Sequence, residues 1–280
     1  MMSRRFFWGE SAVDSILKVA ANVNQQFLES ANSKGPNFKR YQPWMAIPFE
    51  LLKINTPPNW LNGSLFFSEE ELKEFADFIA LLNPGQAHIF SLENYPLKVS
   101  CLSANEAERF RNKILESKIE LEARLRWIKP IYDFLIQKIV PIKSLLESDD
   151  SDYGMSTIWL KGIIFYDWRQ HRPFEFRIEN IAHELAHQII INYQLSDRII
   201  EDDFNRPVYS GIRKVERPAI MAFHGAAALS YMLLAAKALA QENRVQEIRS
   251  NLLETLKSLE DIQMTSLGKI LLREMYESAA

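Results

Sequence analysis

The chain has 280 residues, 47% of them hydrophobic and 25% charged, which is ordinary for a globular protein and far from the composition of a disordered one. A formal net charge of −3 gives no reason to expect nucleic acid or an acidic membrane surface as a partner. The sequence has one cysteine, Cys101, which excludes an internal disulfide framework and a thiolate metal cluster.

Targeting and membrane signals are weak. The apolar patch at residues 6–8 is too short for the core of a signal peptide. The most apolar run, residues 219–240, is interrupted by His224 and Lys237 and is typical of a buried helix rather than a membrane span. We therefore expect a cytoplasmic protein with no membrane partner.

Helical patterns dominate the first half of the chain. The amphipathic period of residues 11–33 predicts a helix, and the prolines and tryptophans of residues 37–64 predict an irregular connection. Capping boxes at residues 68–71 and 103–106 predict the starts of two more helices. The first of these is expected to end near residues 83–85, at Asn-Pro-Gly.

The region that follows gives weaker signals of secondary structure. Residues 88–90 and 97–102 are candidates for short strands. The second capped helix is expected to break or kink at Pro130 and to resume to about residue 146, with Pro141 as a second interruption.

The second half begins after a Ser- and Asp-rich linker at residues 147–154. Its β-branched and aromatic residues predict a strand over 157–166. After it we expect a helix over 176–193, a polar loop over 196–216, a helix from Pro218 and two further amphipathic helices.

This pattern predicts a predominantly α-helical α+β fold with a small sheet. Residues 1–150 form a mostly helical N-terminal part and residues 151–280 carry the candidate site, and we expect the two to form one continuous globular domain.

The segment His183-Glu184-Leu185-Ala186-His187 carries the chemistry. Histidines four residues apart on a helix lie one turn apart on the same face, close enough to share one metal ion. A chance match on an ordinary helix is the competing interpretation. The sequence has only five histidines, and two of them stand at ligand spacing beside a glutamate, which favours the metal site.

The usual interpretation of this motif is a zinc peptidase, in which Glu184 acts as general base on a zinc-bound water. Such a site needs a third ligand. Ile190 and Tyr193 exclude one extended form of the motif, which has Gly and His at those positions. Another form uses a downstream carboxylate, and the candidates stand in no recognisable pattern: Glu201, Asp202, Asp203 and Glu216.

His224 is a better third ligand. It follows Arg217-Pro218 in a helix whose Gly225 and three alanines would let a neighbouring helix approach closely. If Arg217 begins that helix, it lies two turns, or about 10.5 Å, from His224. An arginine there could hold one carboxylate of a short dicarboxylic keto acid whose other end chelates the metal, although an ordinary helix-start arginine fits equally well.

These features together resemble a family of HExxH-motif peptide-modification proteins that occur beside ribosomally made peptides. The resemblance covers about residues 157–234. It rests on the motif, on Tyr209-Ser210-Gly211-Ile212-Arg213, on Arg217-Pro218 and on Phe223-His224-Gly225. The chain departs from the family where Gly211-Ile212 replaces an expected Pro-Trp before Arg213.

The family includes iron- and 2-oxoglutarate-dependent peptide β-hydroxylases. The resemblance therefore implies an Fe(II) dioxygenase with His183, His187 and His224 as ligands and with 2-oxoglutarate and O₂ as co-substrates. It implies that Arg217, with Arg213 second, binds the distal carboxylate of 2-oxoglutarate, and that Glu184 positions a ligand or handles a proton. The implied substrate is a side chain, at Cβ, of a precursor peptide. The zinc peptidase and a non-catalytic binding protein remain the alternatives.

Overall fold

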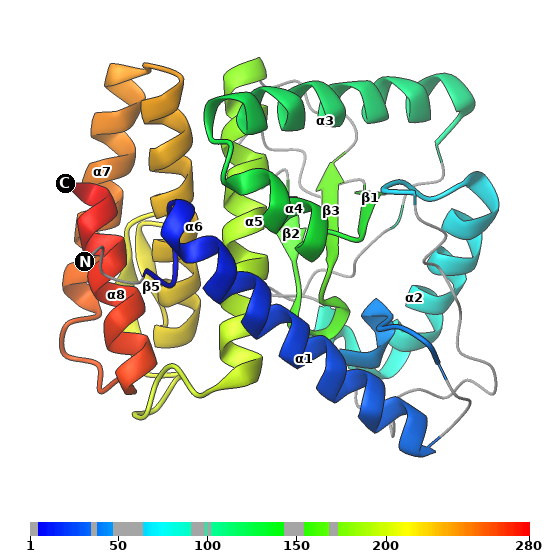
Figure 1. Cartoon of the computed structure of the whole chain (residues 1–280), viewed down its shortest axis with the longest axis horizontal. Coiled ribbons are helices and arrows are strands. Elements are labelled where there is room, and N and C mark those ends of the chain that lie inside the picture. Colours follow the sequence, from blue (N-terminus) through cyan, green and yellow to red (C-terminus); the bar gives the residue numbers. More distant parts are fainter. Residues whose placement is uncertain are drawn as a thin grey trace. The chain divides into compact units, whose positions relative to one another are not determined.

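The computed structural model describes residues 5–34, 38–46, 64–90, 99, 102–142, 154–167 and 173–280 (Figure 1). It is 66% helical, with small sheets of two and three strands, which confirms the predominantly helical α+β fold. Cys101, residues 147–153 of the expected linker and most of the expected irregular connection lie outside the described residues.

The chain forms two compact units that interleave along the sequence. One unit contains Met1–Val23, Ser117–Leu135 and Pro173–Ala280, and the other contains Asn24–Glu116 and Ile136–Arg172. All the candidate site residues belong to the first unit.

The first unit is built around α6 (Ala219–Ala238), which packs against α5 (Phe174–Ser196), α7 (Glu242–Ser258) and α8 (Ser266–Ala279) (Figure 1). The apolar side chains of α6 lie on all of its faces, which is typical of a central helix. By length and composition α6 could cross a membrane, but 78% of its apolar window is buried inside the protein, as expected for the core helix of a soluble protein.

Shorter elements complete this unit. They are η1 (Glu10–Ala12), the first half of α1 (Val13–Lys34), the end of α3 (Ala104–Arg124), α4 (Ile128–Leu135), and an antiparallel hairpin of β4 (Pro207–Ser210) and β5 (Val215–Pro218). The hairpin packs on α6 and α7.

The second unit contains a three-stranded sheet in the order β1-β3-β2. β1 (Lys138–Ile142) runs parallel to β3 (Ile163–Asp167), and β2 (Gly154–Ser156) runs antiparallel to it. The central strand is buried along its whole length. The side chain of Phe165 lies among aromatic residues of α2 (Glu69–Phe90), with its ring centroid 6.1 Å from that of Phe75. A short helix, η2 (Pro43–Ala46), also belongs here.

The helix starts predicted at both capping boxes are confirmed, and the first box forms both of its reciprocal hydrogen bonds. Ser68 N donates to Glu71 Oε2 at 2.8 Å, and Glu71 N donates to Ser68 Oγ at 3.2 Å. Ser103 N donates to Glu106 Oε2 at 2.9 Å. The helices expected over 11–33, over 176–193 and from Pro218 are also present, as α1, α5 and α6.

The expectations at three prolines are wrong. α2 continues through Pro84 to Phe90, so residues 88–90 are helical, because a proline removes one helical hydrogen bond without having to end the helix. The break before α4 falls ahead of Pro130, which lies in the first turn of α4, where no N–H is needed. Residues 138–142 form strand β1 rather than helix, and Pro141 is tolerated there because β1 is an edge strand of its sheet.

Two local expectations need correction. The strand expected over 157–166 is divided into a single 3-10 turn, η4 (Ile158–Leu160), and β3, because Gly162 between them adopts a φ of 94°, which turns the chain. The polar loop expected over 196–216 contains most of the β4–β5 hairpin, whose strands of four residues are too short to show a clear alternation.

Candidate metal centre

Helix α5 presents the first two histidines. His183 and His187 lie one turn apart, with their Nε2 atoms 3.0 Å from each other. The rest of this part of α5 is buried in the core, so the helix cannot rotate without exposing apolar residues. Both rings are partly buried, and the side chain of His183 is 18% exposed.

His224 comes from the neighbouring helix α6 and completes a row of imidazoles. Its Nδ1 lies 3.4 Å from Nδ1 of His187, and the two rings stack with centroids 5.5 Å apart. The structure thus brings together the three histidines that the sequence singles out, from two helices in direct contact.

Hydrogen bonds at both ends orient the outer rings. His224 Nε2 lies 2.9 Å from Gln194 Oε1, and since an amide oxygen only accepts, His224 Nε2 carries the proton. His183 Nδ1 lies 3.3 Å from Met232 Sδ, a weak acceptor, which suits a proton on Nδ1 of His183. In these tautomers both outer rings turn an unprotonated nitrogen toward His187. Metal-binding histidines are commonly oriented by an acceptor for the other ring nitrogen.

The spacing of the first pair fits a metal. Two nitrogens that each lie about 2.1 Å from one ion, at right angles, are about 3.0 Å apart. His187, however, presents Nε2 to His183 and Nδ1 to His224, so the rings as they lie do not point at a single centre. In the part of the chain that the structure describes, no group of three or more His, Cys, Asp or Glu side chains is arranged to hold an ion. A three-histidine site therefore requires one of these rings to turn.

The environment keeps the histidines neutral, as ligands must be. Burial lowers the pKa of His183 and of His224 to about 4 each. The pKa of His187 is also lowered well below its ordinary value, first by burial and then by the other two histidines and the positive charge of Arg217. At neutral pH each of the three rings therefore has one unprotonated nitrogen, whose lone pair can bind a metal ion.

Glu184 lies beside the pair. Its carboxylate is 1% exposed, and Oε1 lies 3.9 Å from His183 Nε2, too far for a hydrogen bond. A carboxylate in this position can reach a group held near His183, which both candidate roles for Glu184 require.

Arg217 is near the cluster, since its charge acts on His187. It belongs to β5, opposite Val208, and α6 begins only at Ala219. The expectation that Arg217 starts the helix, two turns from His224, is therefore wrong in its geometry. Arg213 is exposed and lies in the turn between β4 and β5, where its backbone N–H donates to Ser210 O at 3.2 Å.

The hairpin explains Gly225. A Cβ atom on Gly225 would lie 3.3 Å from Ile212 Cγ2 and 3.8 Å from Ser210 Oγ. The small residue next to His224 therefore admits the tip of the hairpin, and not a neighbouring helix as the sequence suggests. Gly211 in the same tip packs on α7, with its N–H donating to Thr255 Oγ1 at 2.8 Å.

Two residues that contact the histidines were not predicted from the sequence. Gln194 and Met232 hold the outer histidines, and neither belongs to a motif. A signal exists for Gln194, because residues 183, 187 and 194 fall on one face of a helix. Two of the carboxylates considered as third ligands are engaged elsewhere: Glu201 accepts from Gln263 at 3.0 Å, and Asp202 pairs with Arg206 at 3.2 Å.

No family model matches the chain, and no curated protein matches it. The family resemblance drawn from the motif residues stays a prediction.

Proposed function

We propose that this protein is an Fe(II)- and 2-oxoglutarate-dependent dioxygenase that hydroxylates a side chain, at Cβ, of a ribosomally synthesised precursor peptide in the cytoplasm. The observation that supports it best is the row of three neutral imidazoles, whose third member is His224 and not one of the carboxylates considered as a third ligand. Imidazole suits iron as well as zinc. Three protein ligands leave three positions of an octahedron for a bidentate co-substrate and O₂.

In this proposal His183, His187 and His224 hold the ion. The bound iron, with 2-oxoglutarate and O₂, supplies the oxidising chemistry: one oxygen atom enters the substrate C–H bond and the other enters succinate, with release of CO₂. Met232 and Gln194 keep the outer imidazoles in the correct tautomer. Glu184, with its buried carboxylate, positions a ligand or accepts a proton near His183.

Arg217 is the proposed partner of the distal carboxylate of 2-oxoglutarate. Its positive charge lowers the pKa of His187, so Arg217 is near the cluster, which supports this role. Arginine is suited to this role because its planar fork can hold a carboxylate through two hydrogen bonds. Arg213, in the hairpin turn, is the second candidate.

A zinc-dependent peptidase is the alternative, and one observation favours it: the carboxylate of Glu184 lies 3.9 Å from His183 Nε2, close enough to act on a water bound near that histidine.

The deciding experiment is anaerobic loading of the protein with Fe(II), followed by admission of O₂ and 2-oxoglutarate and quantification of succinate. We expect succinate from the iron-loaded protein and none from the zinc-loaded protein. His224→Ala should remove the activity while leaving the helical content unchanged. If the iron-loaded protein neither binds 2-oxoglutarate nor forms succinate, while the zinc-loaded protein cleaves peptides, the peptidase replaces the oxygenase.

A further inference from the structure

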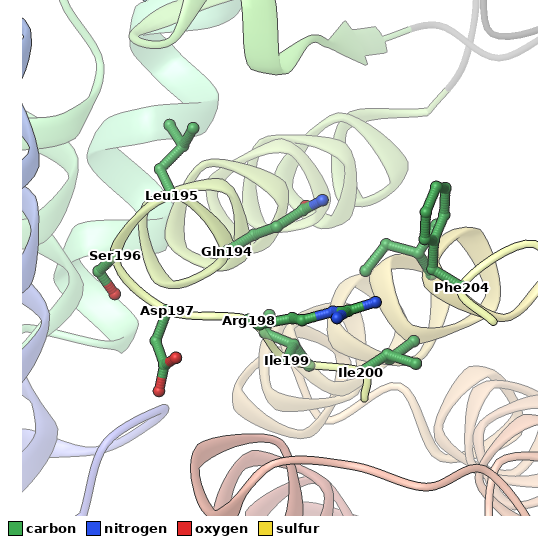
Figure 2. Close-up of a pocket in the computed structure, with 9 residues that line it drawn as sticks. Gln194, Leu195, Ser196, Asp197, Arg198, Ile199, Ile200 and Phe204 are labelled. Atoms are coloured by element: carbon green, nitrogen blue, oxygen red, sulfur yellow. The ribbon is translucent and has the colours of Figure 1, made fainter. Parts of the chain in front are cut away.

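A cavity of about 320 Å³ opens beside the histidine row, where α5 ends (Figure 2). Its lining comes from the end of α5, the following loop and the first turn of α6: Gln194, Leu195, Ser196, Asp197, Arg198, Ile199, Ile200, Phe204 and Ile220. None of the histidines, Glu184, Arg213 or Arg217 lines it. Gln194 joins the cavity to the candidate metal centre, because the same side chain accepts from His224.

Arg198 is the positively charged residue among those that line this cavity. Figure 2 shows its side chain running from the end of α5 toward Phe204, while Ser196 and Asp197 point the other way. Among the described residues, no hydrogen bond or ion pair joins its guanidinium to another group. Its five donors are therefore available to a ligand.

Gln194 offers a second donor. Its Oε1 lies 2.9 Å from His224 Nε2. The nitrogen end of that amide then projects into the cavity, as Figure 2 shows. The cavity thus combines one positive charge and one amide donor, both suited to oxygen acceptors.

Apart from Ser196 and Asp197, the rest of the lining is apolar. Phe204 is 50% exposed, and in Figure 2 the Arg198 side chain extends toward it. Ile220, four residues before His224 on α6, is only partly buried and also lines the space. A ligand that fits this lining carries a carboxylate next to an apolar or aromatic group.

We propose that this cavity binds an acidic residue of the peptide substrate together with its apolar neighbour. Arg198 would hold the carboxylate, Gln194 would donate to the same carboxylate or to a backbone carbonyl, and Phe204 would cover the apolar side chain. The proposal deepens the proposed function, on which it rests, because it assigns a substrate class to the surface beside the metal centre.

The test uses metal-free protein, so that it does not depend on catalysis. The probe is a short peptide with Asp beside para-fluorophenylalanine, and binding is followed by the fluorine NMR signal of the peptide. A matched peptide with Asn in place of Asp is the reference. We expect the Asp peptide to bind roughly two- to fivefold more tightly, since Arg198 is exposed and solvent weakens an ion pair there.

Arg198→Gln should remove this preference, and Gln194→Glu should weaken binding of the Asp peptide by placing a negative charge opposite it. Arg273→Gln is the matched control: Arg273 lies on α8, exposed and 3.9 Å from Glu277, and does not line the cavity. Circular dichroism confirms that each variant is folded.

Equal binding of the Asp and Asn peptides, or equal behaviour of the Arg198→Gln and Arg273→Gln variants, would overturn the proposal. So would displacement of the peptide by 2-oxoglutarate in an Arg198-dependent manner, because Arg198 would then serve the co-substrate. Failure of the succinate assay with an intact Asp preference would instead reject the oxygenase and leave the peptide site standing.

Discussion

His187 lies between two imidazoles and has one proton to share. It faces His183 Nε2 at 3.0 Å and His224 Nδ1 at 3.4 Å, and both of those nitrogens are unprotonated in the orientation set by Met232 and Gln194. A neutral His187 can donate to only one of them, so the other contact brings two lone pairs together. A cation relieves this repulsion, and burial disfavours a proton in that role because it lowers the pKa of all three rings. In the function that we propose, a divalent metal is that cation.

Glu184→Gln separates the two candidate reactions. If Glu184 is a peptidase base, its loss should abolish turnover, because no other group activates the water. In the oxygenase that we propose, the variant should still bind iron and retain measurable succinate formation. The measurement is metal content by elemental analysis together with succinate yield. A variant that retains its metal but has lost all activity would count heavily against the oxygenase.

Arg217→Ala tests the co-substrate. We expect iron affinity to remain nearly unchanged and 2-oxoglutarate binding to weaken by roughly 2–5 kcal/mol, because removing one partner of a desolvated charge pair leaves the other unpaired. Arg217→Lys should recover only part of this loss, since an ammonium keeps the charge but not the planar fork. The assay is an anaerobic titration of the absorbance of the iron–2-oxoglutarate complex. Unchanged affinity in the Ala variant would transfer the role to Arg213.

At the scale of elements, the β4–β5 hairpin fixes the surroundings of His224. A Cβ atom on Gly211 would lie 2.1 Å from the backbone oxygen of Asn251 in α7, which cannot yield without moving the helix. A Cβ atom on Gly225 would instead lie 3.3 Å from a methyl group of Ile212, which has some freedom to shift. Gly211 therefore packs against rigid backbone, whereas Gly225 packs against a side chain that can shift, although both glycines lie where the hairpin contacts its neighbouring helices.

Gly211→Ala should destabilise the protein by about 1–3 kcal/mol or more, as overpacking against a rigid neighbour does. Gly225→Ala is the matched comparison and should cost clearly less. Urea unfolding, with the midpoint and slope compared for both variants and the unmodified protein, measures the difference. Equal midpoints for the two variants would show that the hairpin does not pack on α7 in solution.

The sequence predicts helices better than it predicts where they end. The capping boxes at Ser68 and Ser103 are local and chemically specific, and the helix starts that they predict are confirmed. The helix end expected at Pro84 and the break expected at Pro130 failed because a proline restricts one hydrogen bond, while tertiary packing decides whether the helix continues. The β4–β5 hairpin was missed because strands of four residues are held by contacts with α6 and α7 rather than by their own pattern.

In the candidate site, too, local features could be predicted from the sequence, whereas features that depend on tertiary contacts could not. His183 and His187 follow from helical spacing, which is a local property of the chain. His224 could be chosen from its small-residue surroundings, yet its orientation depends on Gln194, which comes from another helix. The place of Arg217 in β5 could not be predicted, because it depends on pairing with Val208.

At the scale of the whole molecule, stability should depend on pH through Lys161. This side chain is 2% exposed, its Nζ is bonded to Asn24 and lies 4.6 Å from the centre of the Tyr41 ring, and burial lowers its pKa from 10.5 to about 7. Between about pH 7 and pH 10 the unfolded chain binds a proton at this lysine that the folded protein does not. Stability should therefore rise with pH in this window, and the contribution should be constant below it.

Lys161→Met removes the titrating group and keeps a flexible, apolar side chain. We expect the variant to lose this dependence, a change of at most about 1.4 kcal/mol per pH unit, and to be the more stable of the two near pH 7. Unfolding in urea at a series of pH values between 7 and 10 measures it, with Lys18→Met on exposed α1 surface as the control. Parallel curves for the Lys161 variant and the unmodified protein would show that Lys161 is charged in the folded state.

Gln194 touches both His224 and the cavity, so the two sites share one side chain. If an occupant of the cavity steadies the Gln194 amide, it steadies the imidazole that the amide holds, and the two binding equilibria become thermodynamically linked. Such linkage is reciprocal: the factor by which a peptide tightens metal binding is the factor by which the metal tightens peptide binding. The protein would then hold its ion most firmly when a substrate is present, and one glutamine at the end of a helix would carry the cooperativity.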